Sequence, residues 1–468
     1  MHIRKNIKNI RLWAVAAGIL FLNSCTKKED AFVNRKVSFN ADWSFHLNDS
    51  IVDKDTIGAA TKWRTLDVPH DWSIEGKFDE KSPAGYGGGS LNGGLGWYKK
   101  TFKVAAEDST KITSITFDGV YRNSEVWVNG HYLGKRPNGY IGFQYEISPY
   151  LNYGEKNNEI IVKVDNSKQP NSRWYSGSGI FRNVWIETTD KLHVENWGTY
   201  VTTPKVTSEK ASVNIETRIQ NDHSDSKKAT IVTTIYKEDS KVTSVTSQIT
   251  LTAKSGLLFN DKVEIENPIL WSDEKPELYT AVTEILVDDK VVDQYKTNFG
   301  IRDFKFDLNK GFILNGKQVK IKGVCMHHDL GPLGSAINTR AIARQLEILK
   351  EMGVNGIRTS HNPPAPELLD LCDKMGFIVM DEAFDMWKQN KTKYDYANDW
   401  DKWHRQDLND QLRRDRNHPS IFMWSIGNEI PEQWNETGIE IAKELAEIVS
   451  LNDKTRPITV GMKPPVKK

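Results

Sequence analysis

Cysteine is scarce in this 468-residue chain, which contains only Cys25, Cys325 and Cys372. So few cysteines exclude a disulfide scaffold, and their spacing is not that of a metal site. The chain also lacks an excess of charge of either sign, because 63 Lys and Arg residues nearly balance 62 Asp and Glu residues and the net charge is +1. No nucleic-acid partner is therefore expected. Length and composition instead indicate an ordinary globular protein of about three domains.

Long hydrophobic runs are also lacking, since the N-terminal run from Leu12 to Leu22 is too short for a stable membrane span. It follows basic residues and ends in Leu22-Asn23-Ser24-Cys25, which predicts a signal peptide over 1–25. Small residues before a cysteine resemble a bacterial lipobox, which implies a lipoprotein whose mature N-terminus is lipidated Cys25. The alternative is a plain cleavage site near a cysteine. A lipidated protein would lie in the periplasm or on the cell surface, with the lipid anchor as its one membrane contact.

Two β-rich regions follow the signal peptide. Residues 35–190 alternate apolar and polar residues between Gly-rich loops, and Asn129-Gly130 is a strong hairpin signal. Residues 191–302 alternate in the same way, with turn signals between short segments. We expect a β-sandwich in the first region and a small immunoglobulin-like β-sandwich in the second.

From residue 303 to residue 468 the pattern changes to strands alternating with helices. Helices are expected over 338–353, 366–376, 400–416 and 438–451, and strands in KQVKIKGVC, VNGIRTS, FIVMDE, SIFMWSIG and RPITVGM. This alternation predicts parallel strands with right-handed crossovers, as in the first part of a (β/α)₈ TIM barrel.

Polar residues end the first four of these predicted strands. The ends are Met326-His327-His328-Asp329, Arg358-Thr359-Ser360-His361-Asn362, Asp381-Glu382 and Asn428-Glu429. In a TIM barrel this rim carries the catalytic residues. Two carboxyl groups, one with a raised pKa, are what glycoside hydrolysis requires, and Glu429 ends a buried strand.

The segments NGIRTSHNPPAPELLDLCDKMGFIVMDEA and DRNHPSIFMWSIGNE resemble the two signatures of glycoside hydrolase family two, which includes β-galactosidases, β-glucuronidases and β-mannosidases. FNADWSFHL, LDVPHDWSIEG and SRWYSGSGIFRNVWI resemble its N-terminal jelly-roll, galactose-binding-like sandwich. The resemblance implies a multidomain fold of this sandwich, the immunoglobulin-like sandwich and a TIM barrel. It also implies retaining hydrolysis of β-linked sugars in carbohydrate breakdown.

The resemblance also implies roles for individual residues. Glu429 would be the acid/base, Asn428 would bind the sugar 2-hydroxyl, and Arg358 would hold the nucleophile carboxylate. The remaining residues expected at the substrate are His361, His327, Asp381, and Arg173 or Asn171. The alternatives are structural: Asp381 pairs with Arg358, and Trp174 and Arg182 pack the joint between domains.

Two departures from the family pattern bear on activity. In DEAFDMWKQN, Phe384, Met386 and Lys388 stand where some β-galactosidases have magnesium ligands, so no cofactor is expected. The family nucleophile lies on the seventh barrel strand, whereas five strands are visible here. We therefore expect an incomplete barrel, truncated at its C-terminal side, with little activity of its own.

The substrate is expected to be a β-galactoside, part of an oligosaccharide or other glycoside. A β-glucuronidase of the same family remains an alternative, because its discriminating residues would lie beyond Lys468. A non-catalytic carbohydrate-binding lipoprotein is another, with Trp97, Tyr98 and Trp127 available for stacking on sugars. Homo-oligomerisation is left open by the sequence.

Overall fold

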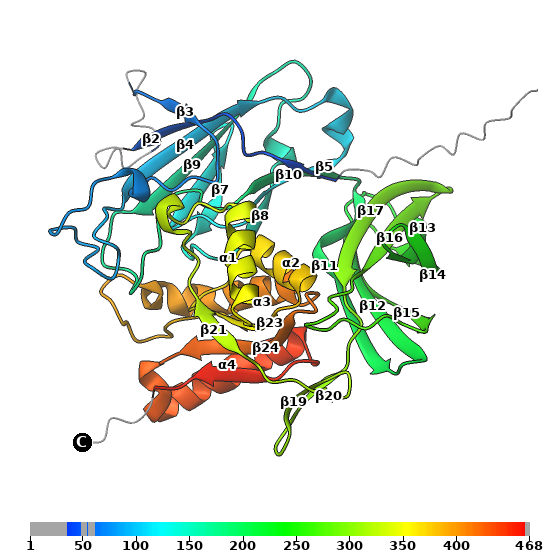
Figure 1. Ribbon diagram of the computed structural model, residues 1–468. Helices are drawn as coiled ribbons and strands as arrows, with labels where there is room; N and C mark the ends of the chain where they lie inside the picture. Colours follow the sequence, from blue (N-terminus) through cyan, green and yellow to red (C-terminus); the bar gives the residue numbers. More distant parts are fainter. Residues whose placement is uncertain (1–34, 48–53, 55–60, 464–468) are drawn as a thin grey trace, which may run out of the picture. The chain divides into compact units, whose positions relative to one another are not determined.

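The first region forms two antiparallel sheets in the computed structural model, which describes residues 35–47, 54 and 61–463 (Figure 1). Hydrophobic side chains such as Trp43, Ile115 and Phe117 fill the core of this first sandwich and are fully buried. At the predicted hairpin, Asn129 and Gly130 both have positive φ and form the turn between β6 (Ser124–Val128) and β7 (His131–Arg136). One sheet consists of β1 (Lys36–Ser38), β10 (Val184–Thr189), β5 (Ile112–Phe117) and β8 (Phe143–Glu146), and the other of β3 (Arg64–Leu66), β2 (Trp43–Leu47), β4 (Gly94–Phe102), β9 (Asn158–Asn166), β6 (Ser124–Val128) and β7 (His131–Arg136).

Trp97 and Tyr98 lie within this sandwich and are fully buried. The hydroxyl of Tyr98 lies 2.7 Å from Nδ1 of His70, also inside the domain. The prediction that these two rings are available for stacking on sugars was therefore wrong, because β4 is a central strand.

The second region is a smaller sandwich, in agreement with the predicted immunoglobulin-like class. Apolar residues on alternate positions of its strands, among them Val213, Ile215 and Ile235, face each other across the two sheets. Its sheets are β11 (Leu192–Val206), β12 (Lys210–Asn221) and β15 (Ser255–Glu266), and β14 (Ser240–Leu251), β13 (Lys227–Lys237), β16 (Tyr279–Val287) and β17 (Lys290–Phe299).

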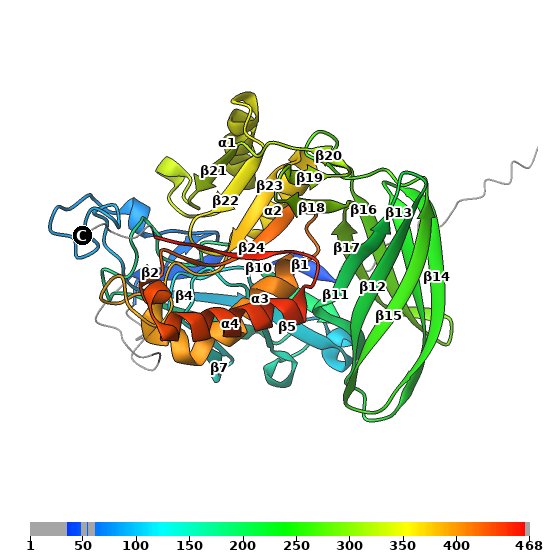
Figure 2. The ribbon, with the colours of Figure 1, turned by 90° about the horizontal axis from the view of Figure 1, so that it is seen from below.

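The third region contains a sheet of five parallel strands, which is open within the described residues (Figure 2). Side chains such as Ile357, Val379 and Trp424 pack against the helices in one apolar core. In chain order the strands are β21 (Gly323–Met326), β22 (Gly356–Thr359), β23 (Ile378–Glu382), β24 (Ile421–Asn428) and β25 (Ile458–Gly461), and the helices are α1 (Thr339–Glu351), α2 (Pro366–Met375), α3 (Trp400–Asp415) and α4 (Glu436–Asn452).

The helix ends agree with the local sequence signals. The Asn338 side chain accepts a hydrogen bond from the Ala341 N–H at the start of α1. Helix α2 begins at Pro366 and is followed by Gly376, whose φ of 72° suits a residue without Cβ. Among the described residues, no helix combines the length and the apolar character that a membrane crossing would require.

One predicted strand is divided between two sheets. KQVKIKGVC was expected to be a single strand, but β20 (Lys317–Gln318) pairs antiparallel with β19 (Gly311–Leu314), which pairs with β18 (Phe304–Asp307). Only β21 joins the parallel sheet, where it pairs with β22. The small antiparallel sheet of β18, β19 and β20 therefore precedes β21, the first strand of the parallel sheet.

Contacts between the first sandwich and the barrel determine which loops reach the strand ends. Arg182, fully buried, donates hydrogen bonds to the carbonyl oxygens of Pro363 at 2.9 Å and Pro364 at 3.0 Å. The carboxylate of Asp71 accepts hydrogen bonds from the Ser335 N–H at 2.9 Å and the Tyr175 hydroxyl at 2.6 Å. These contacts fix the loop that carries Arg173 and Trp174 against the barrel.

Candidate active site

Strand β24 ends in the pair Asn428 and Glu429. Glu429 has a φ of 45°, an uncommon conformation for a residue with a side chain, and its N–H donates to the carbonyl oxygen of Gly461 at 2.6 Å. Its side chain is 44% exposed, in contrast to the apolar residues of the same strand. The strand thus buries its length and presents one accessible carboxylate at its carboxyl end.

The Asn428 side chain is buried and held from two sides. Its Oδ1 accepts a hydrogen bond from Arg358 at 2.8 Å, and its Nδ2 donates to Oδ1 of Asp385 at 2.8 Å. Both contacts fix the orientation of the amide beside Glu429.

Behind Asn428 lies a buried carboxylate, that of Glu382. Arg358 donates to both of its oxygens, at 3.0 and 2.8 Å, and the Ser425 hydroxyl donates at 2.5 Å. Nδ1 of His361 lies 2.7 Å from its Oε1. Burial alone would lower the pKa of Arg358, but Glu382 outweighs this effect and raises it. The Glu382 carboxylate therefore orients the side chains of Arg358 and His361.

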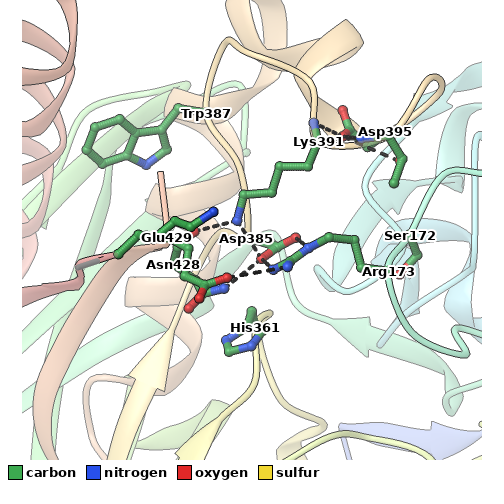
Figure 3. Close-up of polar contacts among 12 residues, drawn as sticks. Ser172, Arg173, His361, Asp385, Trp387, Lys391, Asp395, Asn428 and Glu429 are labelled. Atoms are coloured by element: carbon green, nitrogen blue, oxygen red, sulfur yellow. Dashed lines mark hydrogen bonds and ion pairs between the residues drawn. The ribbon is translucent and has the colours of Figure 1, made fainter. Parts of the chain in front are cut away.

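A second buried carboxylate, Asp385, binds two cations (Figure 3). Arg173 forms a two-point ion pair with it, in which Nε lies 3.0 Å from Oδ2, and Nζ of Lys391 lies 3.0 Å from Oδ1. Burial would raise the pKa of Asp385, but hydrogen bonds and charge from Arg173 and Lys391 lower it overall. Arg173 also extends to Glu429, with Nη1 3.4 Å from Oε2.

Three aromatic rings, those of Trp174, His327 and His361, pack together beside the carboxylates. The Trp174 ring lies 5.0 Å from that of His327 and 5.6 Å from that of His361, measured between ring centroids. Burial, followed by the charge of His361, lowers the pKa of His327, so His327 is neutral near pH 7. A neutral imidazole beside an indole ring suits a face of apolar C–H groups as well as hydroxyls.

The structure brings together most of the residues that the sequence singled out. Glu429, Asn428, Arg358, His361 and Arg173 form a connected network, and His327 adjoins it through Trp174 and His361. Of the two expected alternatives, Arg173 contacts Glu429, whereas the Asn171 amide is buried and donates to Asn166 at 2.7 Å beside a cavity that His361 also lines. Cys25 lies outside the described residues.

The assignment of Asp381 to the substrate pocket was wrong. Its side chain is completely buried and accepts a hydrogen bond from the Gln411 amide on α3 at 2.9 Å. Burial, and then the neighbouring carboxylate of Asp415, raises its pKa. Successive side chains of a strand point to opposite faces, so Glu382 faces the site and Asp381 faces the helix. The alternative pairing with Arg358 was wrong as well, since that partner is Glu382.

Asp385 and Lys391 were missed by the sequence analysis. Both lie in the segment after β23, which was considered only for metal ligands. The sequence did contain one signal for this position, because Asp385 is an acidic residue three positions after the end of β23. Of the positions considered there, Phe384 and Met386 are buried and Lys388 pairs with Asp401 at 2.9 Å.

Comparison with known proteins agrees with this geometry. Models of glycosyl hydrolases family 2 match the sugar binding domain at 37–190, the central domain at 192–302 and the TIM barrel domain at 307–464. The chain belongs to this family, and its fold is a sugar-binding-like sandwich, an immunoglobulin-like sandwich and part of a TIM barrel.

Among relatives, the chain is 48% identical to beta-galactosidase BoGH2A of Bacteroides ovatus, covering 95% of this chain and 56% of that protein. It is 38% identical to a putative beta-glucuronidase of Formosa agariphila, covering 98% and 43%. A solved structure of a family 2 member from Bacteroides cellulosilyticus matches with a TM-score of 0.89 at 40% identity, covering 92% and 56%. The chain thus spans about half the length of the relatives that it matches.

Proposed function

We propose that this chain provides the glycone pocket and the proton donor of a retaining β-glycosidase that acts on β-galactosides. The observation that carries the proposal is the position of Glu429, an accessible carboxylate beside the anchored amide of Asn428. In such a reaction the acid protonates the leaving oxygen and later, as a base, activates water. Nη1 of Arg173, 3.4 Å from Oε2 of Glu429, places a cation beside this carboxylate.

The nucleophile is a different carboxylate from Glu382 and Asp385. A nucleophile must have a free oxygen directed at the anomeric carbon. Glu382 has its oxygens occupied by Arg358, His361 and Ser425, and Asp385 is bound by Arg173 and Lys391. A retaining mechanism places the second carboxyl group about 5–5.5 Å from the acid.

A galactoside is favoured over a glucuronide for two reasons. The relative with 48% identity is a beta-galactosidase, although a beta-glucuronidase lies among the relatives with lower identity. A glucuronide would also need a free cation for its carboxylate. Arg173 and Lys391 are both paired with Asp385, so neither cation is free for this purpose.

The test is equilibrium binding of iminosugars, which mimic the charge of the transition state. Calorimetry would compare a galactose-configured with a glucuronic-acid-configured iminosugar on the whole chain. We expect the galactose form to bind more tightly, and Glu429→Gln to weaken it at least about tenfold, the size of a charge-assisted hydrogen bond. Glu440→Gln, an exposed glutamate on α4, is the matched control.

Three results would contradict the proposal. Absence of binding to the unmodified chain would show that these residues do not form a glycone pocket. Equal binding by Glu429→Gln would remove Glu429 from it. Tighter binding of the glucuronic-acid form would replace the galactoside by the second candidate substrate.

A further inference from the structure

A cleft of about 500 Å³ lies outside the site described above. It is enclosed by β7 and β8 of the first sandwich, β11 of the second sandwich and α3 of the barrel region. It shares no residue with the Glu429 network. Its lining residues are Gly134, Lys135, Arg136, Phe143, Gln144, Tyr145, His193, Glu195, Asn196, Trp197, Trp403, Gln406, Asp410 and Arg413. The volume is within the usual range for pockets that bind small organic ligands.

Helix α3 contributes one continuous face to this cleft. Trp403, Gln406, Asp410 and Arg413 are spaced by three, four and three residues, so they lie along one side of the helix. The opposite side of α3 carries Leu408 and other apolar residues that pack into the barrel core. Because α3 is held rigidly on that side, its polar and aromatic face has a fixed position.

Strand β11 contributes a wide irregularity. Val194 pairs with Ile219 and Thr199 with Thr217, so four residues of β11 stand opposite one residue of β12. Within this bulge Trp197 has a φ of 52°, an outlier for a bulky side chain. Bulges redirect side chains, and strained backbone of this kind concentrates at binding sites. Three of the displaced residues, 195–197, line the cleft.

The charges in the cleft largely neutralise one another. Nη2 of Arg136 is paired with Asp410, and Arg413 donates to Glu195 at 3.0 Å. The Arg136 guanidinium also lies 5.5 Å from the centroid of the Trp403 ring. Beyond these two pairs the lining carries one further lysine, the exposed Lys135, so its net charge is small, and the Arg136 contact holds the ring of Trp403 in place.

Aromatic rings and amides complete the lining. Trp403, Trp197 and Tyr145 are all half-buried, so each exposes part of its ring. Gln144, Gln406 and Asn196 provide amide donors and acceptors. A rigid ring for the C–H face of a pyranose, together with amides for its hydroxyls, is the combination that suits a neutral sugar.

We propose that this cleft is a second carbohydrate site, which binds a neutral oligosaccharide chain away from the position of hydrolysis. Trp403 is the stacking platform, and Gln406 on the same helix face binds hydroxyl groups. The second site would hold one part of a longer glycan while another sugar unit of the same glycan occupies the Glu429 pocket. It does not depend on Glu429 being the proton donor.

Calorimetry on the whole chain tests the proposal with three neutral probes, β-1,4-galactotetraose, cellotetraose and mannotetraose, and with trigalacturonate as the anionic control. The measurements use a Glu429→Gln background to weaken binding in the other pocket. We expect at least one neutral probe to bind with a Kd between about 10 μM and 1 mM, and trigalacturonate to bind at least about tenfold more weakly.

Variants then locate the binding. Trp403→Ala should weaken binding of the neutral probe at least about tenfold, because it removes the stacking ring. Gln406→Ala should weaken the same binding about threefold. Trp63→Ala, a half-buried tryptophan outside the cleft, and Asn428→Ala should leave it unchanged. Gln406 is exposed, so its variant remains informative if Trp403→Ala lowers the melting temperature.

Three results would overturn the proposal. One is that no neutral probe binds at millimolar concentration. Another is binding that survives Trp403→Ala but is lost with Asn428→Ala, because the glycone pocket would then be the site. The last is a Trp403→Ala chain whose association state changes in sedimentation while sugar binding does not, which would make the cleft a protein interface.

Discussion

Arg173 of the first sandwich and Asp385 of the barrel form a two-point ion pair, with Nε 3.0 Å from Oδ2, at the edge of the Glu429 site. The two residues are 212 positions apart in the sequence. The pair links two domains and also positions the arginine that contacts Glu429. Arginine is suited to this role because its planar guanidinium can bind one carboxylate and still offer a further N–H.

Asp385→Asn should destabilise the protein and disorganise the site. It leaves the half-buried Lys391 without its carboxylate partner, and it weakens the contacts to Arg173 and Asn428. We expect a loss of about 3 kcal/mol in the free energy of unfolding, measured with urea. Asp401→Asn is the control, because the Asp401 side chain is 81% exposed and its loss should cost at most about 0.5 kcal/mol. Equal stability of the two variants would show that the Asp385 network does not contribute.

The 468-residue chain should show no steady hydrolysis of nitrophenyl β-galactoside. Within the described part of the chain, the two carboxylates beside Asn428, those of Glu382 and Asp385, are each paired with a cation, and a site without a second free carboxylate loses the covalent step. The measurement is nitrophenol release by the purified chain over many turnovers. Sustained turnover by the purified chain would contradict the prediction, and its loss in Asp385→Asn or Glu382→Gln, with the fold intact, would identify that carboxylate as the nucleophile.

Stability should fall as the pH rises from 6.5 to 9. Burial alone would lower the pKa of His418, but Asp373, at 2.6 Å, outweighs it, and the pKa is raised to about 9. A raised folded-state pKa gives stability that is fully present below pH 6.5 and lost as the pH passes 9. Melting temperatures measured across this range should decline for the unmodified chain and decline less for His418→Gln. An exposed histidine, His131, provides the control variant His131→Gln, whose profile should match that of the unmodified chain.

Cys25→Ala should release the protein from the membrane. We propose that Cys25 carries the lipid and that the protein is held at a bacterial membrane by this anchor. Fractionation of expressing cells, together with labelling by radioactive palmitate, measures both effects. Cys325→Ser is the control, and the anchor proposal fails if Cys25→Ala remains membrane-bound and labelled.

Much of the site could be predicted because strand ends leave a local signature. An apolar run such as Ile421–Trp424 followed by Asn428 and Glu429 indicates a buried strand with a polar end, whatever surrounds it. The helices were predictable for a similar reason, since Asn338, Pro366 and Gly376 act within one turn of the helix end. At the strand ends the error concerns neighbouring residues: Asp381 and Glu382 are both acidic, and only the sheet shows which of them faces the site.

The sequence by itself determined the order of the three domains, the parallel strands and the location of Glu429 at a strand end. These features depend on periodicity and on interactions between residues close in the chain. Only the tertiary structure decided that Asp385 binds Arg173, that Trp97 and Tyr98 are buried, and that a bulge in β11 meets one face of α3. Those contacts join residues far apart in the chain, and their partners are selected by how the domains pack, which no local pattern encodes.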